Sequence, residues 1–138
     1  MCFEEDLELG KKYELEFIKF KGFKEFKVMQ GEFLDYDIIA DNIKYEIKTD
    51  LKSQYTSNIC IEFECNDKMS GINTSKSDYY GYFVLYENDE YDLYEIPTKK
   101  IKKYIRKNKY KKIKFGGDNG RSKFYLFDRS IFKKYKIF

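Results

Sequence analysis

The order of hydrophobic and polar residues predicts a long helix near the start of the chain. Within Glu4–Phe20, the apolar residues Tyr13, Phe17 and Phe20 recur at helical spacing. Gly22 follows them, and glycine commonly ends a helix because it adopts the left-handed backbone conformation without strain. We therefore expect one helix that ends before Gly22.

Short runs of alternating residues predict several strands. The run Asn58–Glu64 alternates cleanly between apolar and polar side chains, as a strand with one buried face does. The pairs Asp41-Asn42 and Asn88-Asp89 suit the tight turns that join neighbouring antiparallel strands. The expected strands are Phe26–Met29, Phe33–Ile39, Ile43–Lys48, Asn58–Glu64, Tyr82–Tyr86, Tyr91–Ile96, Lys112–Phe115 and Phe124–Phe127.

Three shorter helices complete the pattern. Ser75 and Asp78 have the spacing of a capping box, which predicts a short helix at that point. Pro97 suits the first turn of a basic helix over Thr98–Lys107, and another short helix ends the chain. The resulting order is helix, strands, helix, strands, helix, which predicts an α/β fold with a mixed sheet.

Length and composition indicate one domain that spans residues 1–138. Hydrophobic residues make up 42% of the chain, which is enough for a single core. No apolar run approaches the roughly 20 residues of a membrane span, and the acidic N-terminus is unlike a signal peptide. The three cysteines have no disulfide or zinc-site spacing, which favours a reducing compartment. Because histidine is absent, catalysis would have to use carboxylates, lysine or tyrosine.

Charge is divided unevenly along the chain. Residues 1–96 contain 11 basic and 22 acidic residues, a net charge of −11, whereas residues 97–138 contain 16 basic and 2 acidic residues, a net charge of +14. This division is typical of an acidic, metal-binding part followed by a basic extension that holds phosphates. The alternative is compositional drift in an A+T-rich genome, which also enriches lysine.

The most informative residues are Asp37, Glu46 and Lys48. Glu46 and Lys48 stand two apart in an expected strand and therefore share a face, and pairing across the turn at Asp41-Asn42 brings Asp37 beside them. Converging carboxylates repel unless a cation or a proton lies between them. Oxygen ligands without histidine favour Mg²⁺ or Mn²⁺, and Lys48 is suited to orient a water or balance charge on a phosphate. The simpler alternative is an exposed hairpin with cross-strand Glu–Lys pairs.

These residues, in this order, resemble the motif of the PD-(D/E)xK nuclease superfamily. Asp37 matches its metal-binding aspartate, Glu46 its second metal ligand and Lys48 its catalytic lysine, although Tyr36 stands where many members have proline. The resemblance implies a restriction-endonuclease-like αβββαβ core with a mixed central sheet, extended here by a basic C-terminal helix and hairpin. It also implies hydrolysis of nucleic acid with Mg²⁺ or Mn²⁺.

Residues 33–127 are similar in particular to small viral and phage-type endonucleases of this superfamily. Asn58, Glu62, Ser70 and Gly71 match positions that usually accompany the motif in such sequences. The resemblance implies that Glu62 completes the metal or water shell as a fourth catalytic residue, and the alternative is a structural salt bridge. Glu14 is a further candidate ligand, as first-helix carboxylates sometimes are in this superfamily.

Basic residues of the C-terminal third are the main expected contacts with nucleic acid. Their density fits binding to the phosphate backbone, which weakens as salt rises. On the expected short helix, Lys76 is suited to meet a phosphate and Tyr80 to stack on an unpaired base, unless the tyrosine lies in the core. The expected contacts are Lys76, Tyr80, Lys99, Lys100, Lys103, Arg106, Lys107 and Arg121.

The sequence thus predicts a Mg²⁺-dependent endonuclease that hydrolyses DNA, including branched or flap structures formed in repair, recombination or replication. Two alternatives stay open: an RNA endonuclease, and a catalytically silent module of the same fold that binds nucleic acid or a protein. We expect a cytoplasmic protein, at the nucleoid or a viral replication site, without a membrane partner. A homodimer would supply the two sites needed to cut both strands.

Overall fold

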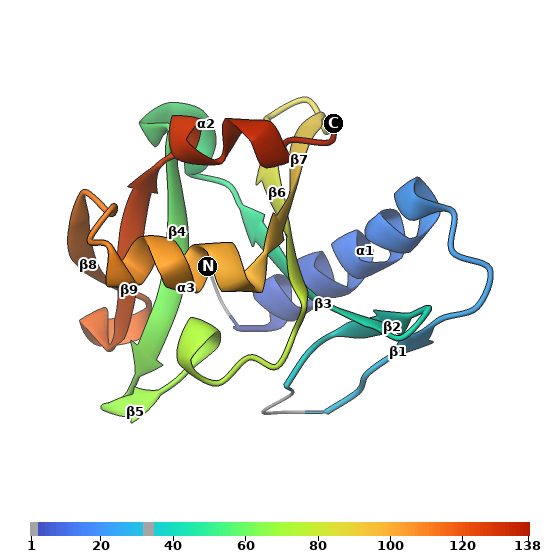
Figure 1. Cartoon of the computed structure of the whole chain (residues 1–138), viewed down its shortest axis with the longest axis horizontal. Helices are drawn as coiled ribbons and strands as arrows, with labels where there is room; N and C mark the ends of the chain where they lie inside the picture. Colours follow the sequence, from blue (N-terminus) through green and yellow to red (C-terminus); the bar gives the residue numbers. More distant parts are fainter. Residues whose placement is uncertain (1–2, 32–34) are drawn as a thin grey trace.

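The computed structural model describes residues 3–31 and 35–138 and shows an α/β protein (Figure 1). It contains a mixed sheet of five strands and an antiparallel sheet of four strands. Cys2 and the beginning of the strand expected at Phe33–Ile39 lie outside the described residues. Within the described part, no helix is both long and apolar enough to cross a membrane.

The first helix, α1 (Phe3–Lys21), agrees with the helix predicted from the aromatic spacing. Tyr13, Phe17 and Ile18 are buried against the first sheet, and burial of this apolar stripe fixes the helix in place. The helix ends at Gly22, whose φ of 68° is left-handed and whose N–H donates to the Ile18 carbonyl at 3.0 Å.

The five-stranded sheet is mixed and carries α1 on one face. Its strands, in spatial order, are β1 (Lys27–Val28), β2 (Ile38–Ala40), β3 (Ile43–Asp50), β6 (Tyr79–Leu85) and β7 (Tyr91–Pro97). β2 and β3 form the predicted hairpin, and the turn residues Asp41 and Asn42 have the left-handed φ values of 53° and 64° that a two-residue turn requires. β3 pairs in parallel with β6, and the other pairs are antiparallel.

The four-stranded sheet corrects the prediction of a single central sheet. Its strands, in spatial order, are β5 (Lys68–Met69), β4 (Asn58–Cys65), β9 (Ser122–Asp128) and β8 (Lys112–Gly116). After β3, a short helix, α2 (Ser53–Thr56), and the left-handed residue Ser57 redirect the chain. β4 therefore pairs with β9 from the far end of the sequence, and not with β3.

The helices of the second half agree with the prediction in two places and differ in one. α3 (Thr98–Arg106) is the expected basic helix, and Arg129–Tyr135 is the expected short C-terminal helix, in 3₁₀ form. The short helix expected from Ser75 onwards is wrong: a 3₁₀ turn lies earlier, at Gly71–Asn73, and Tyr79 already belongs to β6. Ser75 does not cap a helix because its hydroxyl is buried in contacts with distant residues.

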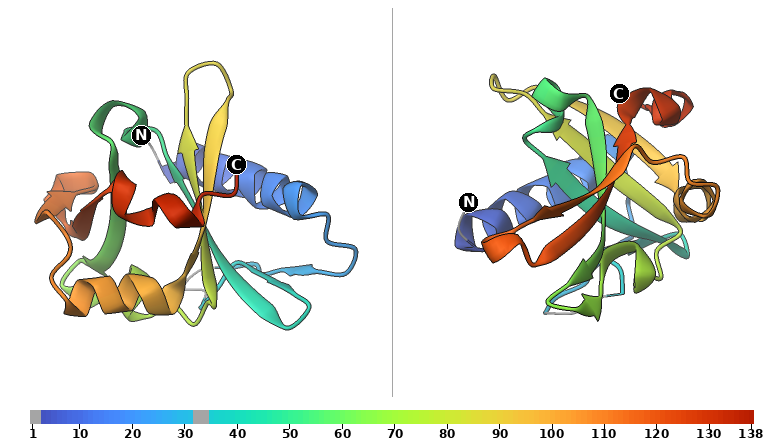
Figure 2. Two further views of the ribbon diagram at one scale, coloured as in Figure 1. Left: turned by 45° about the horizontal axis from the view of Figure 1, so that its top comes forward. Right: turned by 90° about the vertical axis from the view of Figure 1, so that its left-hand side faces the viewer.

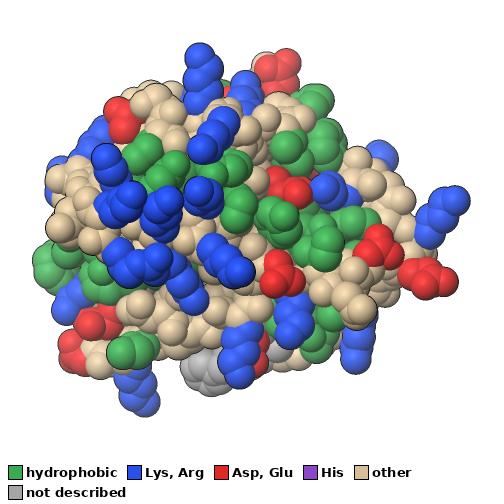
Figure 3. Space-filling view, viewed as in Figure 1, with side chains coloured by type: hydrophobic (Ala, Val, Ile, Leu, Met, Phe, Trp, Pro, Cys, Tyr) green, Lys and Arg blue, Asp and Glu red, His purple; other side chains and the backbone are tan. Residues whose placement is uncertain are grey.

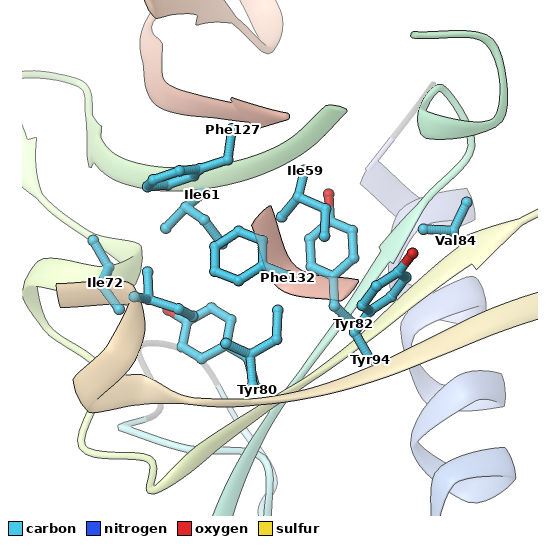
Figure 4. Packing of buried hydrophobic residues seen from close by; sticks show 11 residues of the cluster. Ile59, Ile61, Ile72, Tyr80, Tyr82, Val84, Tyr94, Phe127 and Phe132 are labelled. Carbon is cyan, nitrogen blue, oxygen red and sulfur yellow. The ribbon is translucent and has the colours of Figure 1, made fainter. Parts of the chain in front are cut away.

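Two hydrophobic clusters cover the two faces of the first sheet. α1 covers one face, whereas Tyr80, Tyr82 and Val84 point from the other face toward Ile59 and Ile61 of β4 (Figure 4). Figure 2 shows α1 and the second sheet on different sides of β3 and β6. Alternate residues of β3 therefore face either α1 or the space between the two sheets.

Candidate active site

Asp37 and Glu46 lie side by side because the β2–β3 pairing continues one residue beyond β2. The Asp37 N–H donates to the Tyr45 carbonyl at 2.9 Å, and the Asp37 Oδ2 accepts from the Ile47 N–H at 2.7 Å. Tyr45 and Ile47 face α1, so Glu46, between them in β3, faces the opposite side. This local geometry directs the two carboxylates toward each other.

Glu46 is the most buried carboxylate of this group, with 9% of its surface exposed. Burial raises its pKa to about 8; the Lys48 charge opposes this shift, while the charge of Asp37 and a hydrogen bond to it add to it. The Ser75 hydroxyl also donates to Glu46 Oε1 at 3.1 Å. In the absence of a cation, the Asp37–Glu46 pair therefore holds a proton near neutral pH, as adjacent carboxylates do.

Lys48 shares the face of Glu46, two residues further along β3. Burial lowers the pKa of its ammonium, but the negative charges of Glu46, Asp37 and Glu62 outweigh this effect and the pKa is raised. Lys48 therefore stays cationic. Among the described residues it forms no ion pair within 4.0 Å, so its charge is surrounded by carboxylates without being fixed to one of them.

Glu62 approaches this group from β4, in the second sheet, and is held there by the Ser70–Gly71 loop. Its Oε2 accepts a hydrogen bond from the Ser70 hydroxyl at 2.9 Å. Gly71 has a φ of 52°, and a Cβ at this position would lie 2.1 Å from the Glu62 carbonyl oxygen, so only glycine fits. No Glu62–Lys48 salt bridge within 4.0 Å occurs among the described residues.

A buried chain of hydroxyl groups connects Glu46 to the start of α3. The Ser75 and Ser77 hydroxyl oxygens lie 2.8 Å apart, and those of Ser77 and Thr98 lie 3.1 Å apart. All three residues are buried, and Thr98 is the first residue of α3. No periodic pattern of residues predicts these hydroxyl contacts, since their members come from one loop and one helix terminus.

Glu14 adds a third acidic group near Asp37. Burial raises the Glu14 pKa to about 7, the Asp37 charge adds to this shift and Lys11 opposes it. Glu64, in contrast, forms an ion pair with Lys123 at 2.6 Å and belongs to a different part of β4, beyond a register shift. Asn58 accepts a hydrogen bond from Lys111 at 2.6 Å. That Asn58 accompanies the nuclease motif, as the resemblance implies, stays a prediction.

The ligand geometry fits a magnesium-like cation only in part. In the described residues, no group of three or more carboxylate or cysteine side chains is close enough to hold a metal ion. Mg²⁺, however, is commonly held by one or two carboxylates and completed by water and substrate phosphate. Asp37 and Glu46 supply such a pair, and the buried Tyr80 lies beside Glu46 in the neighbouring strand β6.

Tyr80 corrects one expected nucleic-acid contact. It lies in β6 and is only 1% exposed, packed in the cluster that includes Ile61 and Ile72 (Figure 4). Its ring therefore cannot stack on a base in this structure. Lys76 is exposed, and its ammonium lies 3.7 Å from the Asp35 carboxylate.

The basic residues of α3 form a continuous charged surface, which is seen as the blue patch over α3 in Figure 3. The charge of Lys100, followed by those of Lys107, Lys134 and Arg106, lowers the pKa of Lys103, which shows that these cations are close together. Arg121 lies apart from them, exposed in the turn before β9, where it lines a hollow of about 610 Å³ with Phe115. No α3 side chain takes part in an ion pair among the described residues, so this surface is free to attract anions.

Comparisons with known proteins identify no relative from which a function could be inferred. No protein-family model matches the chain, and no curated protein matches it either. The arrangement of Asp37, Glu46 and Lys48 is therefore the main basis for a functional proposal.

Proposed function

We propose that this protein is a metal-dependent nuclease that hydrolyses phosphodiester bonds of DNA, including branched or flap structures. The observation that carries the proposal is the meeting of two carboxylates, Asp37 and Glu46, beside the cationic Lys48, which forms no ion pair within the described part of the chain. A finer proposal is that α1, the β2–β3 hairpin and β6 correspond to part of the PD-(D/E)xK core.

The two carboxylates would hold Mg²⁺ or Mn²⁺, which supplies a Lewis acid for activating water and neutralising phosphate charge. One oxygen of Asp37 accepts from the Ile47 N–H, and the carboxylate also lies in hydrogen-bond contact with Glu46. Glu46 likewise has one oxygen engaged by Ser75, which fixes the direction of its second oxygen. Backbone and hydroxyl donors thus fix one oxygen of each carboxylate, and the cation would take the place of the proton that the pair shares.

Lys48 has the charge and freedom needed for the reacting phosphate. Its ammonium can donate to the attacking water or to a phosphate oxygen, stabilising negative charge as it develops. In the hydrolysis, a water oxygen bonds to phosphorus and one ester P–O bond breaks, which leaves a phosphate on one product end and a hydroxyl on the other. The charges of Glu46 and Asp37, and to a smaller extent that of Glu62, raise the pKa of Lys48 and so keep it protonated.

The basic surface of α3 supports nucleic acid as the substrate. Cations without acidic partners attract the phosphate backbone, and this attraction weakens with salt. Because Thr98 starts α3 and belongs to the hydroxyl chain that reaches Glu46, the first turn of the helix is structurally joined to the carboxylates. The proposed contacts are Lys99, Lys100, Lys103, Arg106 and Lys107.

A cleavage assay tests this function. Wild-type protein is incubated with labelled single strands, duplexes, flaps and junctions of DNA and RNA, with Mg²⁺, with Mn²⁺ or with EDTA. We expect divalent-cation-dependent cleavage that Asp37→Asn abolishes. Asp41→Asn is the matched control, because Asp41 lies in the exposed turn of the same hairpin and asparagine accepts its left-handed φ. Equal activity of wild type and Asp37→Asn would refute the proposal.

A catalytically silent nucleic-acid-binding module is the second candidate. It is favoured by the lack, among the described residues, of a third acidic ligand within reach of a metal held by Asp37 and Glu46. Salt-sensitive DNA binding without cleavage of any substrate in the panel would identify it.

A further inference from the structure

A second basic surface lies on the β8–β9 hairpin, on the same face of the sheet as Glu62. Glu62 of β4 pairs directly with Phe124 of β9, and Phe124 pairs with Lys114 of β8. Residues directly opposite in antiparallel strands project on the same face. The next row of that face, two residues further along each strand, ends in Lys112.

This face is opposite to the one that α3 covers. Ile101 of α3 packs in one cluster with Ile59 and Ile61 of β4, and Glu62 alternates with Ile61 along the strand. The right-hand view of Figure 2 shows α3 end-on at one side of β4 and β9, with the β8–β9 turn extending to the other side. The hairpin lysines are therefore separate from the α3 surface.

Lys112 and Lys114 are exposed, and neither forms an ion pair among the described residues. Their neighbours differ, since Lys111 lies 3.5 Å from Asp128 and Lys123 lies 2.6 Å from Glu64. Two residues of a strand span about 6.6 Å, so the two ammonium groups form a short row along β8, with Lys114 level with Glu62 and Lys112 level with Cys60.

Lys52, which lies outside the second sheet, is a third cation near Cys60 of β4. Burial and Asp50 raise the Cys60 pKa to about 11, while Lys114 and Lys52 oppose this shift. Both lysines therefore lie near the Cys60 thiol, although Lys114 belongs to β8 and Lys52 precedes α2. Lysines from two separate parts of the chain thus lie near β4, the strand that carries Glu62.

Phe124 of β9 lies between Lys114 of β8 and Glu62 of β4. Its ring is partly exposed and lies against Gly116, where a Cβ would be 3.1 Å from the ring. Because Gly116 has no side chain, it leaves room for this ring. A partly exposed aromatic ring beside unpaired cations is the combination that binds single-stranded nucleic acid, where bases stack and phosphates meet lysines.

We propose that an unpaired nucleic-acid strand enters the active site along this hairpin face, with phosphates at Lys112 and Lys114 and a base stacked on Phe124. The inference rests on the proposed nuclease function and names the part of the substrate that reaches the site from the Glu62 side.

Binding of a fluorescent single-stranded oligonucleotide, measured by anisotropy in EDTA, tests the lysines without catalysis. The variant Lys112→Ala/Lys114→Ala should bind about tenfold or more weakly, and the slope of log K against log salt should fall by about 1.4, for two lost phosphate contacts. Lys24→Ala/Lys27→Ala removes the same charge from exposed positions around β1 and should change affinity by less than about twofold. Equal losses in both variants would overturn the proposal.

Phe124→Leu tests stacking with an apolar side chain that keeps the hairpin packed. Affinity for an ordinary single strand should fall about fivefold or more, and affinity for an abasic strand of the same length should not change. Loss of affinity for both strands, or for neither, would contradict stacking on Phe124. Thermal unfolding of each variant should match the wild type.

The outcomes separate this inference from the proposed function. If the wild type binds single strands through the hairpin but cleaves no substrate with Mg²⁺ or Mn²⁺, the nuclease proposal fails and the binding path stands. If the wild type cleaves and the hairpin variants bind and cleave as it does, the binding path fails and the nuclease proposal stands.

Discussion

The carboxylate group and the basic surface of α3 differ in how their charges are held. Glu46 is buried, linked to Ser75 and adjacent to Asp37, so its position depends on many packing contacts. Lys103 and Lys107 lie among like charges and form no ion pair among the described residues. The first region is thus specified by geometry and the second by charge density. Single substitutions should have large effects in the first region and modest, salt-dependent effects in the second.

The largest effect is expected for Lys48→Met. Methionine fills a similar volume but cannot donate a proton or stabilise charge on a phosphate, so the cleavage rate should fall by about 10³-fold. Binding of DNA in EDTA should be nearly unchanged, and this pair of results is measured by single-turnover cleavage and anisotropy. Lys68→Met, in the exposed strand β5, is the control. If cleavage and binding fall by the same factor, Lys48 acts in substrate binding, as the α3 lysines do, and not in the chemical step.

A smaller effect is expected for Ser75→Ala, which removes the donor to Glu46 Oε1 and breaks the hydroxyl chain to Thr98. Loss of a residue that orients a metal ligand typically costs about 10- to 100-fold in activity or metal affinity. We expect kcat and Mn²⁺ affinity to fall while KM stays constant. Thr74→Ala alters an exposed neighbouring hydroxyl and should leave all three unchanged. A change in KM alone would argue against a positioning role.

The α3 surface should respond differently. Lys103→Ala/Lys107→Ala should raise KM for a duplex about five- to tenfold at low salt, leave kcat unchanged, and reduce the salt slope of binding by about 1.8. The effect should fade as salt is raised, because these cations lie at the surface, where salt screens them. A fall in kcat that persists at high salt would show that α3 acts on the chemical step.

The smallest effect concerns stability and pH. The Glu14 pKa is about 7 in the folded chain against a usual 4.5, so the folded state binds the proton more tightly. Stability from this group is complete below pH 4.5 and is lost as pH rises through 7. In EDTA, Glu14→Gln should equal the wild type at pH 4 and be about 1–2 kcal/mol more stable at pH 8, after allowance for partial exposure.

Urea unfolding at both pH values measures this difference in the free energy of unfolding. Glu25→Gln, at an exposed position, should show no pH-dependent difference. A Glu14→Gln variant less stable than the wild type at pH 8 would show that the ionised carboxylate is favoured by its surroundings.

Local patterns predicted much of the fold, because α1, the β2–β3 turn and α3 each depend on residues close in sequence. The face shared by Glu46 and Lys48 follows from strand alternation, and Asp37 from the turn between the strands. The second sheet was not predictable in this way, since β4 pairs with a strand from the other end of the chain.

Ser75 and Tyr80 show why part of the site escaped prediction. The Ser75–Asp78 spacing is common to helix caps, but here the Asp78 carboxylate accepts from the Lys44 N–H at 2.8 Å and Ser75 binds Glu46. Both residues of the expected capping box therefore form hydrogen bonds with residues distant in sequence instead of capping a helix. Tyr80 is buried because β6 is an interior strand of the first sheet, between β3 and β7, a position that depends on parallel pairing with β3.

Calorimetric titration with Mn²⁺ tests the central claim most directly, since it measures cation binding by Asp37 and Glu46 apart from cleavage. The wild type should bind Mn²⁺ and release protons on binding at pH 7.5, and Asp37→Asn should abolish the binding heat, whereas Asp41→Asn should retain it. A titration in which Asp37→Asn binds Mn²⁺ as the wild type does would contradict the account.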